Sequence, residues 1–162
     1  LKPVDFRVGG ITFAEEGGVR NRKERMTTIR DILIKEGFTA DIYYLYNNIE
    51  YPQKNIDDWT RTWMSCGCIT ENKYYAAFTM ILYSDGSIGD KIEIGLRRLP
   101  QTAERTGKVT NKQLQQLKKN ETYELYETNP WWHICKEISI GTDNDKIINE
   151  LKELEYFASH EL

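Results

Sequence analysis

The chain has 162 residues, of which 40% are hydrophobic and 29% are charged, a composition typical of one globular domain with a single core. Its net charge of −3 excludes the broad cationic surface that non-specific nucleic-acid binding requires, although a small pocket for one nucleotide stays compatible. The most apolar run, residues 74–83, is far shorter than the roughly 20 residues that span a bilayer, so no membrane partner is expected.

Two further features of the sequence bear on its context. There are three cysteines, and Cys66 and Cys68 are too close together for an easy disulfide, which favours a reducing compartment over a secreted scaffold. The chain opens on Leu1-Lys2-Pro3, with neither an initiator methionine nor an apolar signal segment. We therefore expect residues 1–162 to form a single domain excised from a larger protein.

The first part of the chain mixes strand and loop patterns. Apolar and polar residues alternate over Phe6–Phe13, which predicts a strand with a bulge at its glycine pair. The highly charged stretch Glu15–Arg25 predicts a loop or an exposed hairpin, in which its basic residues are solvated. Ile29, Ile32 and Leu33 fit a short helical turn or a strand entry. The β-branched and aromatic residues of 39–46 predict a strand.

The middle of the chain is predicted to hold a helix and a hairpin. Asn55 and the acidic residues after it are typical of a helix start, and Trp59, Trp63 and Cys66 recur at helical spacing. We therefore expect a helix over Ile56–Cys66, ending at Gly67. Residues 75–83 and 91–96 predict a hairpin that turns at Asp85-Gly86.

The last third predicts two helices around two strands. Thr110 or Asn111 can cap a helix that runs to Lys118, and residues 123–126 and 133–140 are strand-like. Apolar residues form one stripe of a final helix over residues 145–157. Strands and helices alternate without a βαβ rhythm, so we predict an α+β fold in which a mixed or antiparallel sheet packs against a few helices.

The sharpest metal-ligand candidate combines Cys66-x-Cys68 with His133-x-Cys135, four residues whose donor atoms suit tetrahedral zinc. Its spacing differs from the usual zinc knuckle, and buried cysteines commonly pack as small core residues. We expect no cofactor and no stoichiometric zinc in the purified domain. Elemental analysis that found one zinc per chain, lost when Cys66 and Cys68 are both changed to serine, would contradict this.

No catalytic motif is present in the sequence. The two histidines, His133 and His160, lie outside any recognisable nucleophile signature, and the glycine pairs lack the spacing of a phosphate loop. The feature that favours a binding function is the aromatic content of ten tyrosines, five phenylalanines and four tryptophans. Most of these residues should pack in a core. Trp131 and Trp132 are adjacent and cannot both face inward on a strand, so at least one of them is exposed or covered by a loop. These features predict a binding domain and not an enzyme.

Three patches of the sequence resemble one known domain. They are the opening Phe6-Arg7-Val8-Gly9-Gly10-Ile11-Thr12-Phe13, followed by Gly17 or Gly18 and Arg22-Lys23-Glu24; then Lys35-Glu36-Gly37-Phe38; and last Gln113-Leu114 with Lys119, Leu125, Asn129 and Trp131. In this order they resemble the cap-binding domain of the second basic polymerase subunit of orthomyxoviruses, in a divergent, thogotovirus-like form. They cover about a third of the chain, and residues 46–99 do not align with that family.

The resemblance implies a non-catalytic domain that positions capped RNA for cap-snatching transcription priming in the host nucleus. Its implied partners are the 5′ 7-methylguanosine of capped RNA and the other viral polymerase subunits, with which it would also enter the virion; DNA is not among them. A weaker resemblance links Gly10-Ile11-Thr12-Phe13 and Asp85-Gly86-Ser87-Ile88-Gly89 to HIRAN domains, which bind single-stranded DNA ends. The acidic-Asn-Pro core of that family is missing here. A purely structural protein-interaction domain is the third hypothesis.

Carried over residue by residue, the resemblance implies a cap-like nucleotide site at Phe6, Lys35 and Lys112, with Phe6 as one clamp aromatic and the lysines at positions that the family fills with histidine. The guanine-reading carboxylate falls on Thr39, so Asp41 is the nearest substitute.

The second clamp aromatic falls on Cys66, with Trp63 one turn earlier in the expected helix. Loss of one ring and one carboxylate would weaken a cap site by roughly 2–6 kcal/mol. The sequence therefore predicts weak 7-methyl-GTP binding with little preference over GTP.

Overall fold

A computed structural model gives the structure of the chain and describes residues 17–99, 109–118, 122–129 and 131–162. The strand predicted over Phe6–Phe13, and with it the candidate clamp residue Phe6, lies outside the described residues.

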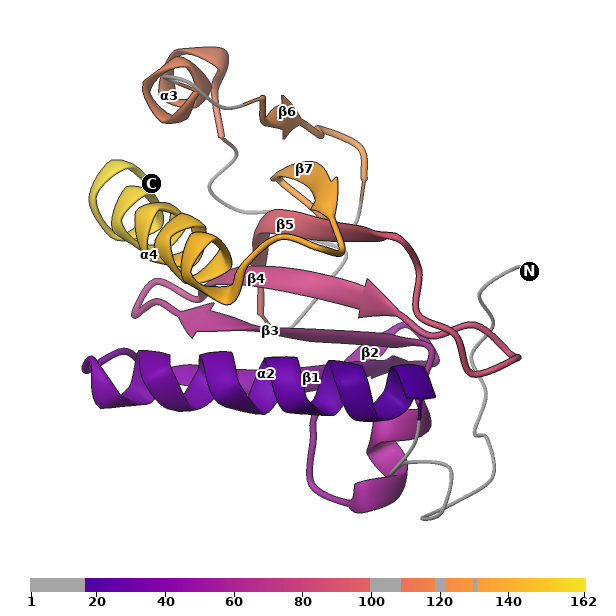
Figure 1. Ribbon diagram of the computed structural model, residues 1–162. Coiled ribbons are helices and arrows are strands. Elements are labelled where there is room, and N and C mark those ends of the chain that lie inside the picture. The colour runs from indigo at the N-terminus through magenta and orange to yellow at the C-terminus, as the bar shows by residue number, and fades with distance from the viewer. Residues whose placement is uncertain (1–16, 100–108, 119–121, 130) are drawn as a thin grey trace.

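The described residues form one seven-stranded sheet in which every neighbouring pair of strands is antiparallel, in the order β2-β1-β3-β4-β5-β7-β6 (Figure 1). The strands are β1 Ala40–Tyr46, β2 Ile49–Pro52, β3 Trp63–Ile69, β4 Tyr74–Ile81, β5 Lys91–Arg98, β6 Glu124–Leu125 and β7 Ile134–Ser139. Together with the helices, this sheet confirms the predicted α+β class.

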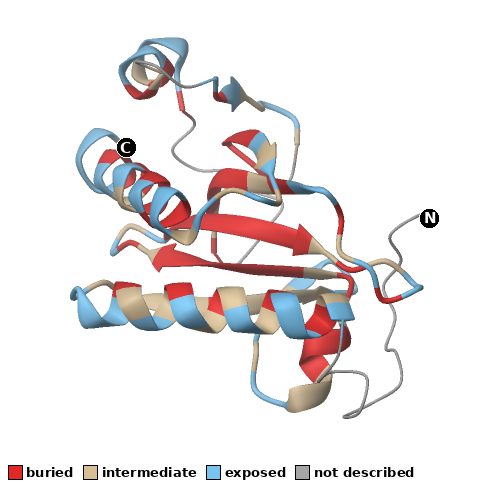
Figure 2. Ribbon diagram, in the orientation of Figure 1, coloured by how far each residue is buried: buried red, intermediate tan, exposed pale blue. Residues whose placement is uncertain are grey.

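Two long helices, α2 (Gly17–Lys35) and α4 (Asn144–Glu161), cover one face of this sheet and contact each other. A short helix, α3 (Asn111–Leu117), packs near the end of α4, and a single 3₁₀ turn, η1 (Ile56–Thr60), precedes β3. The burial pattern follows this layering, because β3, β4 and β5 are buried along most of their length while the outer sides of α2 and α4 are exposed (Figure 2).

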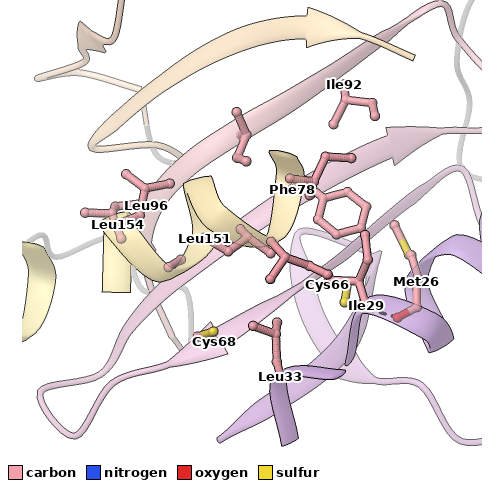
Figure 3. Close-up of a cluster of buried hydrophobic side chains, with 14 of the residues drawn as sticks. Met26, Ile29, Leu33, Cys66, Cys68, Phe78, Ile92, Leu96, Leu151 and Leu154 are labelled. Carbon is pink, nitrogen blue, oxygen red and sulfur yellow. Dashed lines mark hydrogen bonds between the residues drawn. The ribbon is translucent and has the colours of Figure 1, made fainter. Parts of the chain in front are cut away.

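The core lies between the two helices and the sheet. In β3 and β4 the alternate residues Met64, Cys66 and Cys68 pair with Met80, Phe78 and Ala76, and all six belong to the main core cluster. Side chains of α2 and α4 close over them, as Met26, Ile29, Leu33, Leu151 and Leu154 show in Figure 3. Because strand side chains alternate in direction, the intervening residues point to the other side of the sheet.

The loop predicted over residues 15–25 is wrong for residues 17–25, which belong to the 19-residue helix α2. The buried stripe of this helix is Val19, Arg22, Met26, Ile29 and Leu33, and its second member is an arginine. A charged residue on the buried side breaks the apolar periodicity, so the sequence pattern indicated an exposed segment. The short helical turn expected around Ile29 is the second half of this longer helix.

The helix predicted over Ile56–Cys66 is also wrong beyond Thr60. After η1 the chain extends, and Trp63–Ile69 forms the central strand β3. The spacing of Trp59, Trp63 and Cys66 was coincidental, because Cys66 alternates with Ser65 and Gly67 across the two faces of a strand. Gly67 does not end a helix. It pairs with Ala77 in β4, where an added Cβ would lie 1.9 Å from the carbonyl oxygen of Ala76.

The other element predictions that fall on described residues are confirmed to within four residues at each end. The strand over residues 39–46 is β1, and the hairpin over residues 75–96 is β4 and β5, with Gly86 at φ 86° in its turn. Thr110 caps α3 by accepting a hydrogen bond from the backbone N–H of Gln113 at 3.2 Å. The predicted strands of the last third are β6 and β7, and the predicted final helix is α4, with its apolar stripe buried.

Candidate ligand-binding site

The face of the sheet that points away from α2 and α4, here called the second face, carries polar side chains over a buried floor. One row runs in register across four strands, from Ser65 through Thr79 and Glu93 to Glu137. A cavity of about 320 Å³ opens over part of this row. Residues that line it include Glu50, Trp63, Ser65, Thr79, Glu93, Arg97, Asn129, Trp131 and Trp132.

A buried ion pair forms the floor of this cavity. The Arg97 guanidinium lies 2.5 Å from Glu50 Oε1, and the two side chains are 5% and 6% exposed. Arg97 also donates to Ser65 Oγ at 2.7 Å, so two oxygen acceptors hold one end of the guanidinium. Because Glu50 is on the edge strand β2 and Arg97 on β5, this pair ties the β1–β2 hairpin to the middle of the sheet.

Aromatic rings enclose Arg97 on the second face. Its guanidinium lies 4.5 Å from the centre of the Trp132 ring and 5.1 Å from that of Tyr75. The Tyr75 hydroxyl donates to the backbone carbonyl of Asp41 at 2.9 Å. These long side chains can lie along the sheet because small residues, Gly67, Ala77 and Gly95, occupy the row next to them. Cation–π contacts of this kind keep Arg97 in place.

Three of the four tryptophans line the cavity, and each is positioned in a different way. Trp132 is buried and donates its indole N–H to Glu93 Oε2 at 2.8 Å. Trp131 is half-buried, and its backbone N–H donates to Asn129 Oδ1 at 2.7 Å. Trp63, also half-buried, begins β3. The prediction that at least one of Trp131 and Trp132 is exposed or covered by a loop assumed a strand, whereas β7 begins at Ile134, and Trp131 is the less buried of the two.

Trp63 and Trp131 reach the cavity from different parts of the sheet. Trp131 lies just before β7, which β4 and β5 separate from β3, where Trp63 is found. The half-buried Glu93 carboxylate accepts a hydrogen bond from the Trp132 indole N–H, and within the described ranges it forms no ion pair. The site thus combines ring faces with a carboxylate.

Of the four proposed cap-site residues that the structure describes, Trp63 is the one that lines this cavity. Asp41 is on the second face too, but it pairs with Gly67, four residues along β3 from Trp63, which is about 13 Å away. Lys35 is exposed at the end of α2, and Lys112 is exposed on α3. These two lysines belong to elements outside the cavity, and Phe6 lies outside the described residues.

The sequence reasoning missed Glu50, Glu93, Arg97 and Trp131 as neighbours in one site. A signal was present in β5, where Glu93 and Arg97 alternate with the core residues Ile92, Ile94 and Leu96. Charged residues at alternate positions of an otherwise apolar strand indicate a polar patch on one face. Their distant partner Glu50, 47 residues away along the chain, could not be inferred without the register of the sheet.

The four candidate zinc ligands do not converge. Cys66 and Cys68 point from β3 toward the helices. Cys135 is on β7, pairs with Gly95 and points to the second face of the sheet. His133 stacks edge-on against Tyr74, with 5.6 Å between the ring centres. Within the described parts of the chain, no group of three His, Cys, Asp or Glu side chains is arranged to hold a metal ion.

All three thiols should react slowly in the folded protein. Burial raises the pKa of Cys66 strongly and raises the pKa values of Cys68 and Cys135 to about 12 each. Because the thiolate is the reactive form, we expect alkylation at pH 8 to be slower than in the unfolded chain by roughly a thousandfold. Mass spectrometry after iodoacetamide treatment should find unmodified native protein and three modifications in urea. Rapid native labelling of Cys135 would contradict its assigned burial.

Comparison of the chain with protein-family models, curated proteins and solved structures finds no match. Among the described residues, no helix has both the length and the apolar character needed to cross a membrane.

Proposed function

We propose that this chain is a non-catalytic binding domain whose tryptophan-lined cavity takes a flat cationic ring. The observation that supports this most is the presence of Trp63, Trp131 and Trp132 around a cavity that also holds the Glu93 carboxylate. Among such ligands we favour the 7-methylguanine of capped RNA, the ligand that the sequence resemblance implies. The polymerase setting and the nuclear location stay predictions that rest on that resemblance alone.

Two features of the cavity, its indole faces and its carboxylate, favour a cationic ligand. A positively charged ring gains electrostatic energy against the face of an indole, and tryptophan is the best of the aromatic residues in this respect. A carboxylate such as Glu93 attracts a cation and can accept hydrogen bonds from the N–H groups at a guanine edge. Glu50 lines the same cavity, but Arg97 neutralises it, so Glu93 is the carboxylate left to read the ligand.

This arrangement changes one expectation from the sequence. The departures at Thr39 and Cys66 predicted little preference for a methylated base, because no second ring and no carboxylate were found at the positions carried over. Trp131 and Glu93 supply both kinds of group on the cavity that Trp63 also lines. We now expect 7-methylguanosine to bind about tenfold or more tightly than guanosine, since only the methylated base is cationic.

The alternatives from the sequence gain less support. A HIRAN-like domain binds DNA ends, whose bases are uncharged, so the attraction of a cation to the tryptophan faces and to Glu93 does not apply to that ligand. A purely structural protein-interaction domain is compatible with the fold, but it does not explain a cavity that three tryptophans line. Tight binding of single-stranded DNA ends would move the proposal to the HIRAN-like function.

Removal of either half-buried ring should weaken binding. Base stacking on an aromatic side chain is worth about 1–3 kcal/mol, so Trp63→Ala and Trp131→Ala should each weaken 7-methylguanosine binding by roughly 5- to 150-fold. Quenching of tryptophan fluorescence measures the affinity. The control is Tyr156→Ala, which removes a ring that is 62% exposed on α4. Equal affinity in all three variants would show that the ligand binds elsewhere.

A further inference from the structure

A second cavity, of about 370 Å³, adjoins the first on the same face of the sheet. The two cavities share three lining residues, Glu93, Asn129 and Trp132. The remaining walls come from β6, β7 and their flanking residues, and include Glu124, Tyr126, Cys135, Lys136 and Glu137. A ligand whose ring occupies the first cavity would therefore place any substituent on that side next to these groups.

Three carboxylates dominate the charge of the second cavity. In the β5–β7 register Glu137 lies directly opposite Glu93, and in the β6–β7 register Glu124 lies opposite Cys135. Like charges directly opposite each other on neighbouring strands are destabilising. Glu124 and Glu137 are both exposed, so their charge acts on the space in front of the sheet. The pair of Glu93 and Glu137 is therefore a feature that stability alone does not favour.

The described cations of the two cavities are already engaged. Arg97 pairs with Glu50, and Lys136 Nζ lies 3.0 Å from Glu150 Oε1, with both side chains 7% exposed. The pKa values of two residues on the second cavity agree with a surplus of negative charge around it. A hydrogen bond to Glu124 raises the pKa of Tyr126 to about 12, and burial together with Glu93 raises the pKa of Cys135 to about 12.

We infer that Glu93, Glu124 and Glu137 act as specificity determinants that exclude phosphate groups from the second cavity, so that the 5′-phosphates of a capped end point to solvent and weaken binding of the cationic base instead of adding to it. This inference rests on the proposed function, because it assumes that the base occupies the first cavity. A polyphosphate next to three carboxylates is repelled, and the repulsion weakens as salt screens it. The phosphate chain would then add no affinity, and any phosphates would have to point to solvent.

Calorimetric titration of the whole chain tests this with 7-methylguanosine, 7-methyl-GMP and 7-methyl-GTP, at about 20 mM and about 300 mM salt. We expect the nucleoside to bind about tenfold more tightly than the triphosphate at low salt, and the difference to shrink at high salt. The double variant Glu124→Gln, Glu137→Gln should raise the triphosphate affinity about tenfold at low salt, while the affinity for the cationic nucleoside should fall by a smaller factor.

The control removes the same charge elsewhere, through Glu71→Gln, Glu153→Gln, two exposed positions outside both cavities. If the triphosphate binds more tightly than the nucleoside in the natural chain, or if the double variant changes its affinity no more than the control does, the inference is wrong while the proposed function stands. If none of the three ligands binds, the proposed function is wrong and the inference falls with it.

Discussion

Replacement of Arg22 by methionine is expected to lower the free energy of unfolding by about 3–5 kcal/mol. Arg22 is fully buried on α2, and its guanidinium donates to the backbone carbonyls of Trp59, Arg61, Thr62 and Met80 at 2.5–3.1 Å. Methionine fills a similar volume but leaves these acceptors without their donor. An unsatisfied buried polar group costs about 1–3 kcal/mol, and several carbonyls are affected together.

The cost is expected to be large because Arg22 joins α2 to three other parts of the fold at once. Its four acceptors lie in η1, just before β3 and at the end of β4, so one side chain fixes where α2 meets the sheet. Urea denaturation measures the change. Arg20→Ala, on the exposed side of the same helix, is the control and should cost less than about 1 kcal/mol. A loss below 1 kcal/mol for Arg22→Met would show that the carbonyls find other donors.

The second large effect concerns the ion pair below the candidate site. Glu50→Gln should destabilise the fold by about 3–5 kcal/mol, because it leaves the Arg97 guanidinium buried without a compensating charge. The double variant Glu50→Leu, Arg97→Met removes both charges. Its loss of stability should be smaller than the sum of the losses of the single variants Glu50→Leu and Arg97→Met. Replacement of a whole buried pair by apolar residues is often close to neutral.

Denaturation curves of the single and double variants measure this coupling as a double-mutant cycle. The control is Glu36→Gln, which breaks the ion pair of Glu36 with Lys152, whose side chains are 39% and 33% exposed. Exposed pairs of this kind contribute about 0–1 kcal/mol, so a small loss is expected. Purely additive effects of Glu50 and Arg97 would contradict the view that the pair acts as one unit.

Whether the sequence predicted an element correctly depended on where its charged residues lie. Element types were predictable wherever apolar periodicity was unbroken, as in α4, where Ile147, Ile148, Leu151 and Leu154 form a plain helical stripe. The prediction failed in α2 because Arg22 interrupts that stripe. A buried arginine that is satisfied by carbonyls looks like an exposed residue in the sequence, since its partners lie 37 to 58 positions away along the chain.

The failure at β3 had a different cause and affected the site directly. Short segments rich in Trp and Cys fit helical and strand periods equally well, and the strand was decided by its pairing with β1 and β4. Trp63 was therefore proposed as an aromatic candidate for a helical position that does not exist, and it lines the cavity from the start of β3 instead. The groups around it, Glu93, Arg97 and Trp131, come together only through the order of the strands.

In the proposed complex a flat cationic base lies against Trp63 and Trp131. The most direct measurement is a ¹⁵N-labelled NMR titration that follows the four indole N–H signals, each assigned with a Trp→Phe variant. Trp59 provides an internal reference, because it is 3% exposed and does not line the cavity. Saturable shifts of the Trp63 and Trp131 signals with 7-methylguanosine, much weaker shifts with guanosine, and an unmoved Trp59 signal are the predicted result. Unchanged Trp63 and Trp131 signals at millimolar ligand, or equal shifts with guanosine, would contradict the claim.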